Sequence, residues 1–304
     1  MTQNTHWAKL EERGTLWGMR FLLSIYSLLG RRCLQFFLYP VVSYYWLSNQ
    51  TARRASQDYL QRLSTFGLAH SYNSYQHFIS FANAIIDKLA AWSGGLALTD
   101  VVYYGREQLF NELNKGQGVV LLGSHLGNME VCRVIATVDA PIPINILVHT
   151  KHAEKFNQLL KQYNPNSSLN LIQVTEITAA TSILLSDKIA NGELVIIAAD
   201  RTPVSNQQRV ASVDFLGANA LFPQGPFILA ALLNCPVYTV FCLKDQDKHI
   251  IHFEHFSDRL NFPRNNRQSA MQQSIQDYAN RLQHYCLIAP LQWFNFFDFW
   301  ATHD

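Results

Sequence analysis

From Gly118 onward, short apolar runs alternate with longer stretches whose apolar residues recur at helical spacing. A short apolar run bounded by turn residues is typical of a buried strand, whereas the longer pattern is typical of an amphipathic helix. Alternating strands and helices predict an α/β fold around a mainly parallel or mixed sheet. The expected strands cover 118–123, 144–148, 169–174, 193–199, 236–243 and 249–256, and the expected helices begin near 128 and cover 152–163, 178–190, 225–234 and 267–287.

The residues before this alternation are predicted to be helical. Between positions 51 and 89 the apolar side chains lie at helical spacings, and Gly94-Gly95 is typical of a turn. We therefore expect a helical N-terminal region over residues 1–95 and an α/β domain over residues 96–304.

Two apolar stretches, 16–30 and 33–47, lie in the N-terminal region and are separated by Arg31-Arg32. A spanning helix needs about 20 apolar residues, so an interrupted span, a hairpin or interfacial helix pair and a pair of core helices all stay open. The first 62 residues hold eight Lys/Arg and three Asp/Glu, whereas the whole chain has a net charge of only +2. Positive charge beside an aromatic, apolar segment predicts an anchor at an anionic cytoplasmic leaflet. No small-residue cleavage site follows the segment, so a cleaved signal peptide is not expected.

A histidine and a carboxylate follow the first predicted strand, in the sequence Gly-Ser-His125-Leu-Gly-Asn-Met-Glu130. A neutral imidazole is the usual side chain for removing a proton from an attacking hydroxyl or amine near pH 7, and a carboxylate on its other nitrogen fixes the tautomer. Side chains five positions apart do not meet on one helix, so His125 and Glu130 are expected to converge across a loop leading into a helix capped by Asn128. The N–H groups from Gly127 to Met129 are candidates for binding an oxyanion. The pattern therefore suits acyl transfer.

The His-x4-Glu motif and the blocks around it resemble the bacterial late acyltransferases of lipid A biosynthesis, within the wider group of glycerolipid-type acyltransferases. The resemblance covers residues 7–295 in the order and spacing of its blocks. These blocks are Glu12-Arg13-Gly14, Gly30-Arg31, Ala52-Arg53, His125 to Glu130, Asp200-Arg201, Val213 to Gly217 and Phe222 to Phe227.

The resemblance implies a glycerolipid acyltransferase-like α/β sandwich with a helical, membrane-associated N-terminal region. His125 would be the general base and Glu130 would orient it. The acyl chain would pass directly from acyl carrier protein, or from acyl-CoA as the alternative, to a lipid or amphipathic acceptor. The protein would work at the cytoplasmic face of the bacterial inner membrane, without a metal, an organic cofactor or a nucleic-acid partner. The alternatives are a lipid A late acyltransferase proper, a hydrolase that uses water as acceptor, and a non-catalytic lipid-binding or scaffold protein of the same fold.

Four further binding candidates lie in or near the matching blocks. Gly127 and Asn128 belong to the histidine motif. Asp200 and Arg201 follow a predicted strand, where α/β folds commonly place polar site residues. Arg201 is expected to contact a phosphate of the acceptor or donor, and Asp200 to position it. An exposed turn with an internal ion pair is the alternative.

The block Phe222, Pro223, Gln224 and Gly225 is expected to shape the acceptor side, because glycine permits close backbone approach and a helix follows. A plain turn at the start of that helix is the alternative. Lys151 is a weaker binding candidate, and a solvated helix face is its alternative.

Other reactive side chains are interpreted as structural. The five cysteines have no Cys-x-x-Cys spacing and an odd count, which indicates reduced core residues. On a strand, His252 points to the opposite side from His249 and His255, which argues against a metal site. Ser124 lacks the flanking glycines of a hydrolase nucleophile.

The stretch from Pro290 to Asp298 reads Pro-Leu-Gln-Trp-Phe-Asn-Phe-Phe-Asp, where the lipid A enzymes are expected to have a more basic run. Aromatic surface and an acid suit a doubly phosphorylated sugar lipid less well than Arg and Lys do. The acceptor is therefore expected to be less anionic than a lipid A precursor.

Overall fold

The computed structural model describes residues 16–92, 98–129, 131, 142–148, 169–173, 178–202 and 209–300. The strands are β1 (Val101–Tyr104), β2 (Val119–Gly123), β3 (Ile144–Val148), β4 (Leu169–Gln173), β5 (Leu194–Ala198), β6 (Val210–Phe215), β7 (Ala218–Pro223), β8 (Val237–Asp245) and β9 (Lys248–Ser257). All the strands predicted from the sequence are present, with bounds that differ by at most two residues.

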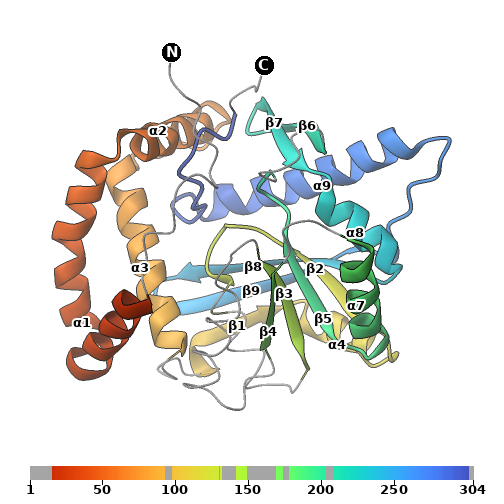
Figure 1. The fold of residues 1–304 in the computed structure, drawn as a ribbon. Helices are drawn as coiled ribbons and strands as arrows, with labels where there is room; N and C mark the ends of the chain where they lie inside the picture. The colour runs from red at the N-terminus through yellow and green to blue at the C-terminus, as the bar shows by residue number, and fades with distance from the viewer. Residues whose placement is uncertain are drawn as a thin grey trace.

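Within the described residues, the centre of the fold is a seven-stranded sheet in the order β1-β9-β8-β2-β5-β3-β4 (Figure 1). Its neighbouring strands are parallel except β8 and β9, which form an antiparallel pair. The predicted α/β class is confirmed.

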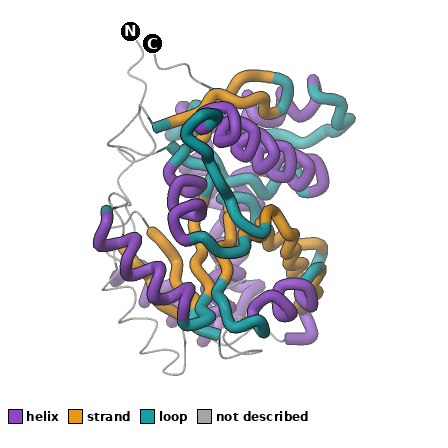
Figure 2. The backbone as a smooth tube through the Cα atoms, turned by 90° about the vertical axis from the view of Figure 1, so that its right-hand side faces the viewer, coloured by secondary structure: helices purple, strands orange, loops and turns teal. Residues whose placement is uncertain are grey.

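The sequence pattern misses β1, which has only four residues at the edge of the sheet, and the antiparallel hairpin of β6 and β7. Small and polar residues in β6 dilute its apolar alternation. The hairpin packs against the last long helix, α9 (Arg267–Ile288), above the sheet (Figure 2). The Gln276 side chain of α9 joins the helix to β6, because it bonds both the backbone N–H and the backbone carbonyl of Asp214 at 2.8 Å.

The other helices are α1 (Leu16–Ser48), α2 (Gln50–Thr65), α3 (Ser74–Trp92), α4 (Arg106–Leu113), α7 (Ala179–Ala190) and α8 (Gly225–Leu233), with a short 3-10 helix at Leu98–Asp100. The helices predicted at 178–190, 225–234 and 267–287 are confirmed, whereas the short helix α4 is not foreseen. The predicted helix at 152–163 lies outside the described residues.

Different helices bury the two faces of the sheet, because successive side chains of a strand point to opposite sides. Val120 and Leu122 of β2 pack with side chains of α7, α8 and α9. Val119 and Leu121 pack on the other face, against α4. Burial on both faces explains why the central strands read as nearly continuous apolar runs.

Helices α1, α2 and α3 lie together beside the sheet (Figure 1). Tyr59, Leu60 and Leu63 of α2 join the main core, so this helix is attached directly to the α/β part of the molecule.

Helix α1 is interrupted at Gly30, where φ is 73° and ψ is 179°. Its second part exposes large apolar side chains, including Phe36, which is 74% exposed, and Tyr44, which is 68% exposed. Among the described residues, no helix combines the length and the apolar character needed to cross a membrane.

Candidate active site

The parallel strands β2 and β5 bring His125 and Asp200 together. Gly123 pairs with Ala198 in the register of these strands, and His125 and Asp200 each follow two positions later. Parallel neighbours end at the same edge of a sheet, where α/β folds commonly build their sites. Strand pairing thus joins two residues that lie 75 positions apart in the sequence.

The ring of His125 is bonded to the carboxylate of Asp200. Nδ1 lies 2.8 Å from Oδ1, and the backbone N–H of His125 donates to Oδ2 at 2.9 Å. An ionised carboxylate only accepts hydrogen bonds, so Nδ1 carries the proton of the neutral ring and Nε2 is its basic nitrogen. The side chain of His125 is 34% exposed and that of Asp200 is 0% exposed. A substrate therefore has access to the imidazole but not to the carboxylate.

The charges around the pair suit a general base. Burial lowers the pKa of His125 below its ordinary value of 6.5, and the charge of Arg201 lowers it further against the opposing pull of Asp200. Burial alone would raise the pKa of Asp200, but His125 and Arg201 outweigh it and lower that pKa to about 2. Burial lowers the pKa of Arg201 to about 10, so its guanidinium stays charged. At pH 7 the site therefore holds a neutral imidazole beside a carboxylate.

The backbone of residues 292–295 runs along the loop after β2, residues 124–128, which carries His125 and is called the histidine loop here. The N–H of Phe294 donates to the carbonyl of His125 at 3.0 Å, and the N–H of Gly127 donates to the carbonyl of Gln292 at 2.8 Å. The side-chain amide of Gln292 in turn accepts from the backbone N–H of Lys244 in β8 and donates to the backbone carbonyl of the same residue. The histidine loop is thus held between β8 and this segment.

Side chains of the same segment complete the surroundings of Asp200. Nε1–H of Trp293 donates to Oδ2 at 3.1 Å, and the Asn295 amide nitrogen lies 3.3 Å from the same oxygen. Nε–H of Arg201 donates to Oδ1 of Asn295 at 2.7 Å, and its terminal nitrogen donates to the carbonyl of Phe294 at 3.0 Å. The carboxylate and the guanidinium are therefore both fixed by residues 293–295.

The family model for bacterial lipid A biosynthesis acyltransferase matches residues 76–302, which include His125, Asp200 and the segment 292–295. The chain belongs to this family. No curated protein matches the chain. The protein is therefore an acyltransferase, which moves an acyl group from an acyl donor to a lipid acceptor.

In this lipid A acyltransferase family member, the described partner of His125 Nδ1 is Asp200. From the sequence, Asp200 is instead expected to position Arg201 for contact with a phosphate; Nε–H of Arg201 donates to Asn295, and the phosphate contact stays a prediction. Glu130, which is expected to orient the ring, and Lys151 lie outside the described residues, and their roles stay predictions.

Of the N–H groups from Gly127 to Met129 that are expected to bind an oxyanion, those of Gly127 and Asn128 have backbone acceptors in the structure, and the oxyanion role stays a prediction. Gly127 donates to Gln292, as noted above, and the N–H of Asn128 donates to the carbonyl of Cys242 at 2.8 Å. The Asn128 side chain also donates to the carbonyl of Ala84 in α3 at 2.8 Å. Gly127 has a φ of 72°, and a Cβ there would lie 1.9 Å from the Cys242 carbonyl oxygen. Both residues therefore hold the histidine loop in place.

The block from Phe222 to Gly225 has the contacts of a turn that starts a helix. Phe222 is fully buried against the rings of Phe215 and Tyr278, and the role of this block in shaping the acceptor side stays a prediction. Pro223 ends β7 and is also buried, while Gly225 begins α8. The Gln224 side chain donates to the carbonyl of Val210 at 2.9 Å.

The segment after Pro290 is mostly interior. Trp293, Phe294 and Asn295 are all buried, so the aromatic surface expected there for an acceptor is wrong for these residues. The stretch contains no Lys or Arg up to Trp300, and the expectation of a less anionic acceptor rests on that fact alone.

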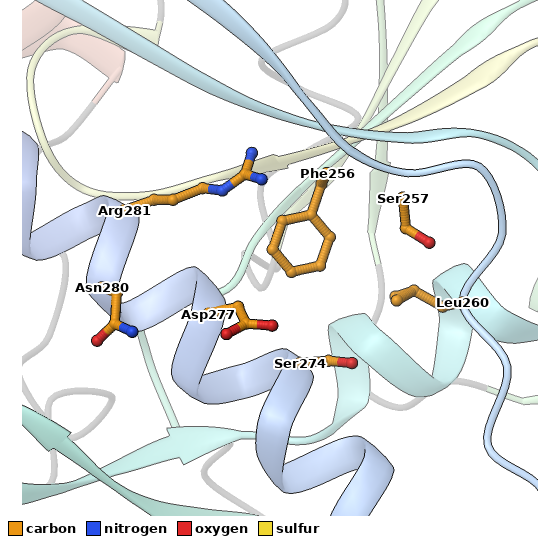
Figure 3. Close-up of a pocket in the computed structure, with 7 residues that line it drawn as sticks. All are labelled: Phe256, Ser257, Leu260, Ser274, Asp277, Asn280 and Arg281. Atoms are coloured by element: carbon orange, nitrogen blue, oxygen red, sulfur yellow. The ribbon is translucent and has the colours of Figure 1, made fainter.

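A cavity of about 400 Å³ lies at the opposite end of the strands from His125. Ser257, one of its lining residues, pairs with Val237 at the start of β8, whereas His125 follows the end of the parallel strand β2. Figure 3 shows the Arg281 guanidinium beside the Phe256 ring, a contact of 4.8 Å that occupies one wall of the cavity. The described residues also contain no cluster of His, Cys, Asp or Glu side chains suited to a metal ion. The site at His125 and Asp200 is therefore the candidate that the described geometry supports.

Proposed function

We propose that the protein transfers a fatty acyl chain from an acyl thioester to a hydroxyl or amino group of a lipid or amphipathic acceptor, with His125 as general base and Asp200 orienting its ring. The observation that carries this proposal is the 2.8 Å contact between Nδ1 of His125 and Oδ1 of Asp200. The contact leaves Nε2 of a neutral, partly exposed imidazole for the proton of the acceptor.

In the proposed reaction, Nε2 of His125 takes the acceptor's proton while the acceptor oxygen or nitrogen attacks the thioester carbonyl carbon. The tetrahedral intermediate then loses the thiolate as the C–S bond breaks, and the imidazolium gives its proton to that thiolate. Asp200 stabilises the imidazolium between these two proton transfers. Transfer is direct, so donor and acceptor are bound together.

Acyl carrier protein is the proposed donor and acyl-CoA the alternative, on the basis of the sequence blocks shared with the lipid A enzymes. The proposed acceptor is less anionic than a lipid A precursor. Expression in a bacterial strain that lacks a late lipid A acyltransferase tests the acceptor. Mass spectrometry of its lipid A should find the acyl chain still missing, and a restored chain at native expression level would contradict this part of the proposal.

The proposed site of action is the cytoplasmic face of the bacterial inner membrane, with α1 as the anchor. The support is a group of large apolar side chains on α1 that are exposed: Leu28, Phe36, Phe37, Tyr39, Val41, Tyr44, Tyr45 and Leu47. Extended apolar patches on a protein surface commonly mark a contact with a membrane or a partner. The excess of Lys and Arg in the first 62 residues favours an anionic lipid surface.

The transfer reaction is tested with purified full-length protein, acyl carrier protein carrying an isotope-labelled acyl chain, acyl-CoA with the same label, and a total bacterial lipid extract. His125→Ala should lower labelling of lipid by roughly 10²–10⁴-fold, because it removes the base and little packing. His284→Ala, at an exposed position of α9, is the matched control. Equal labelling by wild type and a folded His125→Ala variant would refute the mechanism, and release of free fatty acid without labelled lipid would indicate hydrolysis instead.

Sedimentation with phosphatidylglycerol-containing vesicles tests the anchor. The wild-type protein should bind at low salt and be partly released at high salt, because screening weakens attraction to anionic lipid. Replacing Phe36, Phe37 and Tyr44 with serine should weaken binding, whereas Ile183→Ser, at an exposed apolar position of α7, should not. Full-length protein that stays in solution with these vesicles at low salt would overturn this part of the proposal.

A further inference from the structure

We propose that Asn295 is a positioning residue of the acyl-transfer site: its side-chain amide stands between Asp200 and Arg201 and keeps the carboxylate available to His125. The inference rests on the proposed function for its meaning in catalysis. Its geometry rests on the described contacts alone.

The two ends of the Asn295 amide have different partners. Its nitrogen lies 3.3 Å from Oδ2 of Asp200, and its oxygen accepts from Nε–H of Arg201 at 2.7 Å. Asn295 as a whole is 2% exposed, so water has little access to either contact. The buried amide of Asn295 therefore bonds both the Asp200 carboxylate and the Arg201 guanidinium and keeps the two from pairing directly.

The two carboxylate oxygens of Asp200 have different hydrogen-bond partners, and only Oδ1 contacts the His125 ring. Oδ2 receives the backbone N–H of His125, Nε1–H of Trp293 and the Asn295 amide. Oδ1 accepts from the His125 ring. Because guanidinium and carboxylate groups pair readily in a bidentate manner, an Arg201 released from Asn295 would compete with the imidazole for the carboxylate.

Among the described residues, four further titratable side chains close to this part of the core are neutral at working pH. Burial raises the pKa of Tyr59 in α2 and of Tyr278 in α9, and it also raises the pKa of the Cys286 thiol. Burial lowers the pKa of His77 in α3 to about 4. Among the described neighbours, changes in the charge felt by His125 therefore come from Asp200 and Arg201.

Two substitutions at Asn295 should move the titration of His125 in opposite directions. Asn295→Ala removes the amide that lies between Asp200 and Arg201, so Arg201 pairs with Asp200. The pKa of His125 then falls, because the imidazolium is no longer stabilised by the Asp200 carboxylate. Asn295→Asp places a second carboxylate beside Asp200, so the pKa of His125 rises. We expect shifts of about half a pH unit to one unit in each direction, within the range of effects that neighbouring charges produce.

Histidine NMR with isotope-labelled protein measures these shifts, and His125→Gln identifies the resonance. Asn280→Ala and Asn280→Asp, at an exposed position of α9, are the matched controls. Opposite shifts at position 295 and none at position 280 would support the inference. Titration of His125 that is unchanged, or that moves in the same direction, in both folded Asn295 variants would overturn it. If only one Asn295 variant folds, a shift of the expected sign in that variant supports the inference and any other result overturns it.

Acyl transfer provides the second readout. Both Asn295 variants should lower kcat roughly 10–100-fold with little change in the KM for the thioester donor, because the amide acts on the base and not on the substrate. A change in KM alone would overturn the inference. Wild-type protein that lacks acyl transfer would refute the proposed function, while the NMR shifts would still decide the role of Asn295.

Discussion

The buried histidine His77 should make the stability of the protein depend on pH in mildly acidic solution. Its Nε2 lies 3.0 Å from the carbonyl of Trp293 and its Nδ1 lies 2.9 Å from the hydroxyl of Ser56. A carbonyl only accepts, so Nε2 carries the proton of the neutral ring and Nδ1 accepts from Ser56. Burial lowers the pKa of this ring from 6.5 to about 4, against a smaller opposing effect of the Trp293 carbonyl. The folded protein therefore resists the proton that the unfolded chain takes up.

The sign and size of the effect follow from this difference. Between pH 6.5 and about pH 4 the unfolded state binds one more proton than the folded state, so the free energy of unfolding decreases as the pH falls. At about 1.36 kcal/mol for each pH unit, the loss amounts to about 3 kcal/mol at pH 4. The full stabilisation is present above pH 6.5.

Urea unfolding of wild type and His77→Gln, followed by tryptophan fluorescence between about pH 7 and pH 4, measures this loss. Glutamine can bond the same two partners but takes up no proton. Over this range the free energy of unfolding of His77→Gln should therefore decrease by about 3 kcal/mol less than that of wild type. His284→Gln, on the exposed side of α9, controls for the loss of a histidine and should follow wild type. Parallel curves for wild type and His77→Gln would refute the reasoning.

Three further predictions concern the site and its supports. Gly127→Ala should lower acyl transfer more than 10-fold and destabilise the fold by several kcal/mol in urea unfolding, because its Cβ would lie 1.9 Å from the Cys242 carbonyl oxygen. Gly116→Ala, with φ of 88° and open space around the new Cβ, should cost only about 1 kcal/mol, and equal losses would contradict this account. Asp87→Asn should destabilise by roughly 3–5 kcal/mol, because Asp87 is buried and bonds Lys244 at 2.7 and 2.8 Å. A double-mutant cycle with Lys244→Gln checks it, and strictly additive losses would argue against coupling. The kcat/KM of acyl transfer should stay constant from pH 7 down to below pH 6.5 and then fall as His125 takes up a proton, and a midpoint at or above pH 7 would contradict the lowered pKa.

Local patterns were enough to predict most of the sheet and His125, one member of the candidate site. The central strands are buried on both faces, and their apolar runs are therefore visible in the sequence. His125 is found because it follows such a run directly and lies in a recognisable block. Edge strand β1 and the β6–β7 hairpin are missed because their patterns are short or diluted by polar residues.

The roles of Asp200 and Asn295 depend on contacts that a local pattern does not encode. Asp200 meets His125 only because β5 is the neighbour of β2, and strand order is a property of the whole sheet. Two polar residues at equal distances beyond two parallel strands are a usable signal once that order is known. The segment around Asn295 has no periodic pattern, so its burial and its hydrogen bonds could not be predicted.

The position of residues 292–295 also sets when the site can mature during synthesis. His125 and Asp200 leave the ribosome well before Trp293 and Asn295 are translated. Until that later segment docks, Asp200 lacks two donors to Oδ2, and the histidine loop lacks the backbone contacts of Gln292 and Phe294. In a growing chain, His125 and Asp200 would therefore stay without these supports until residues 292–295 are synthesised and docked.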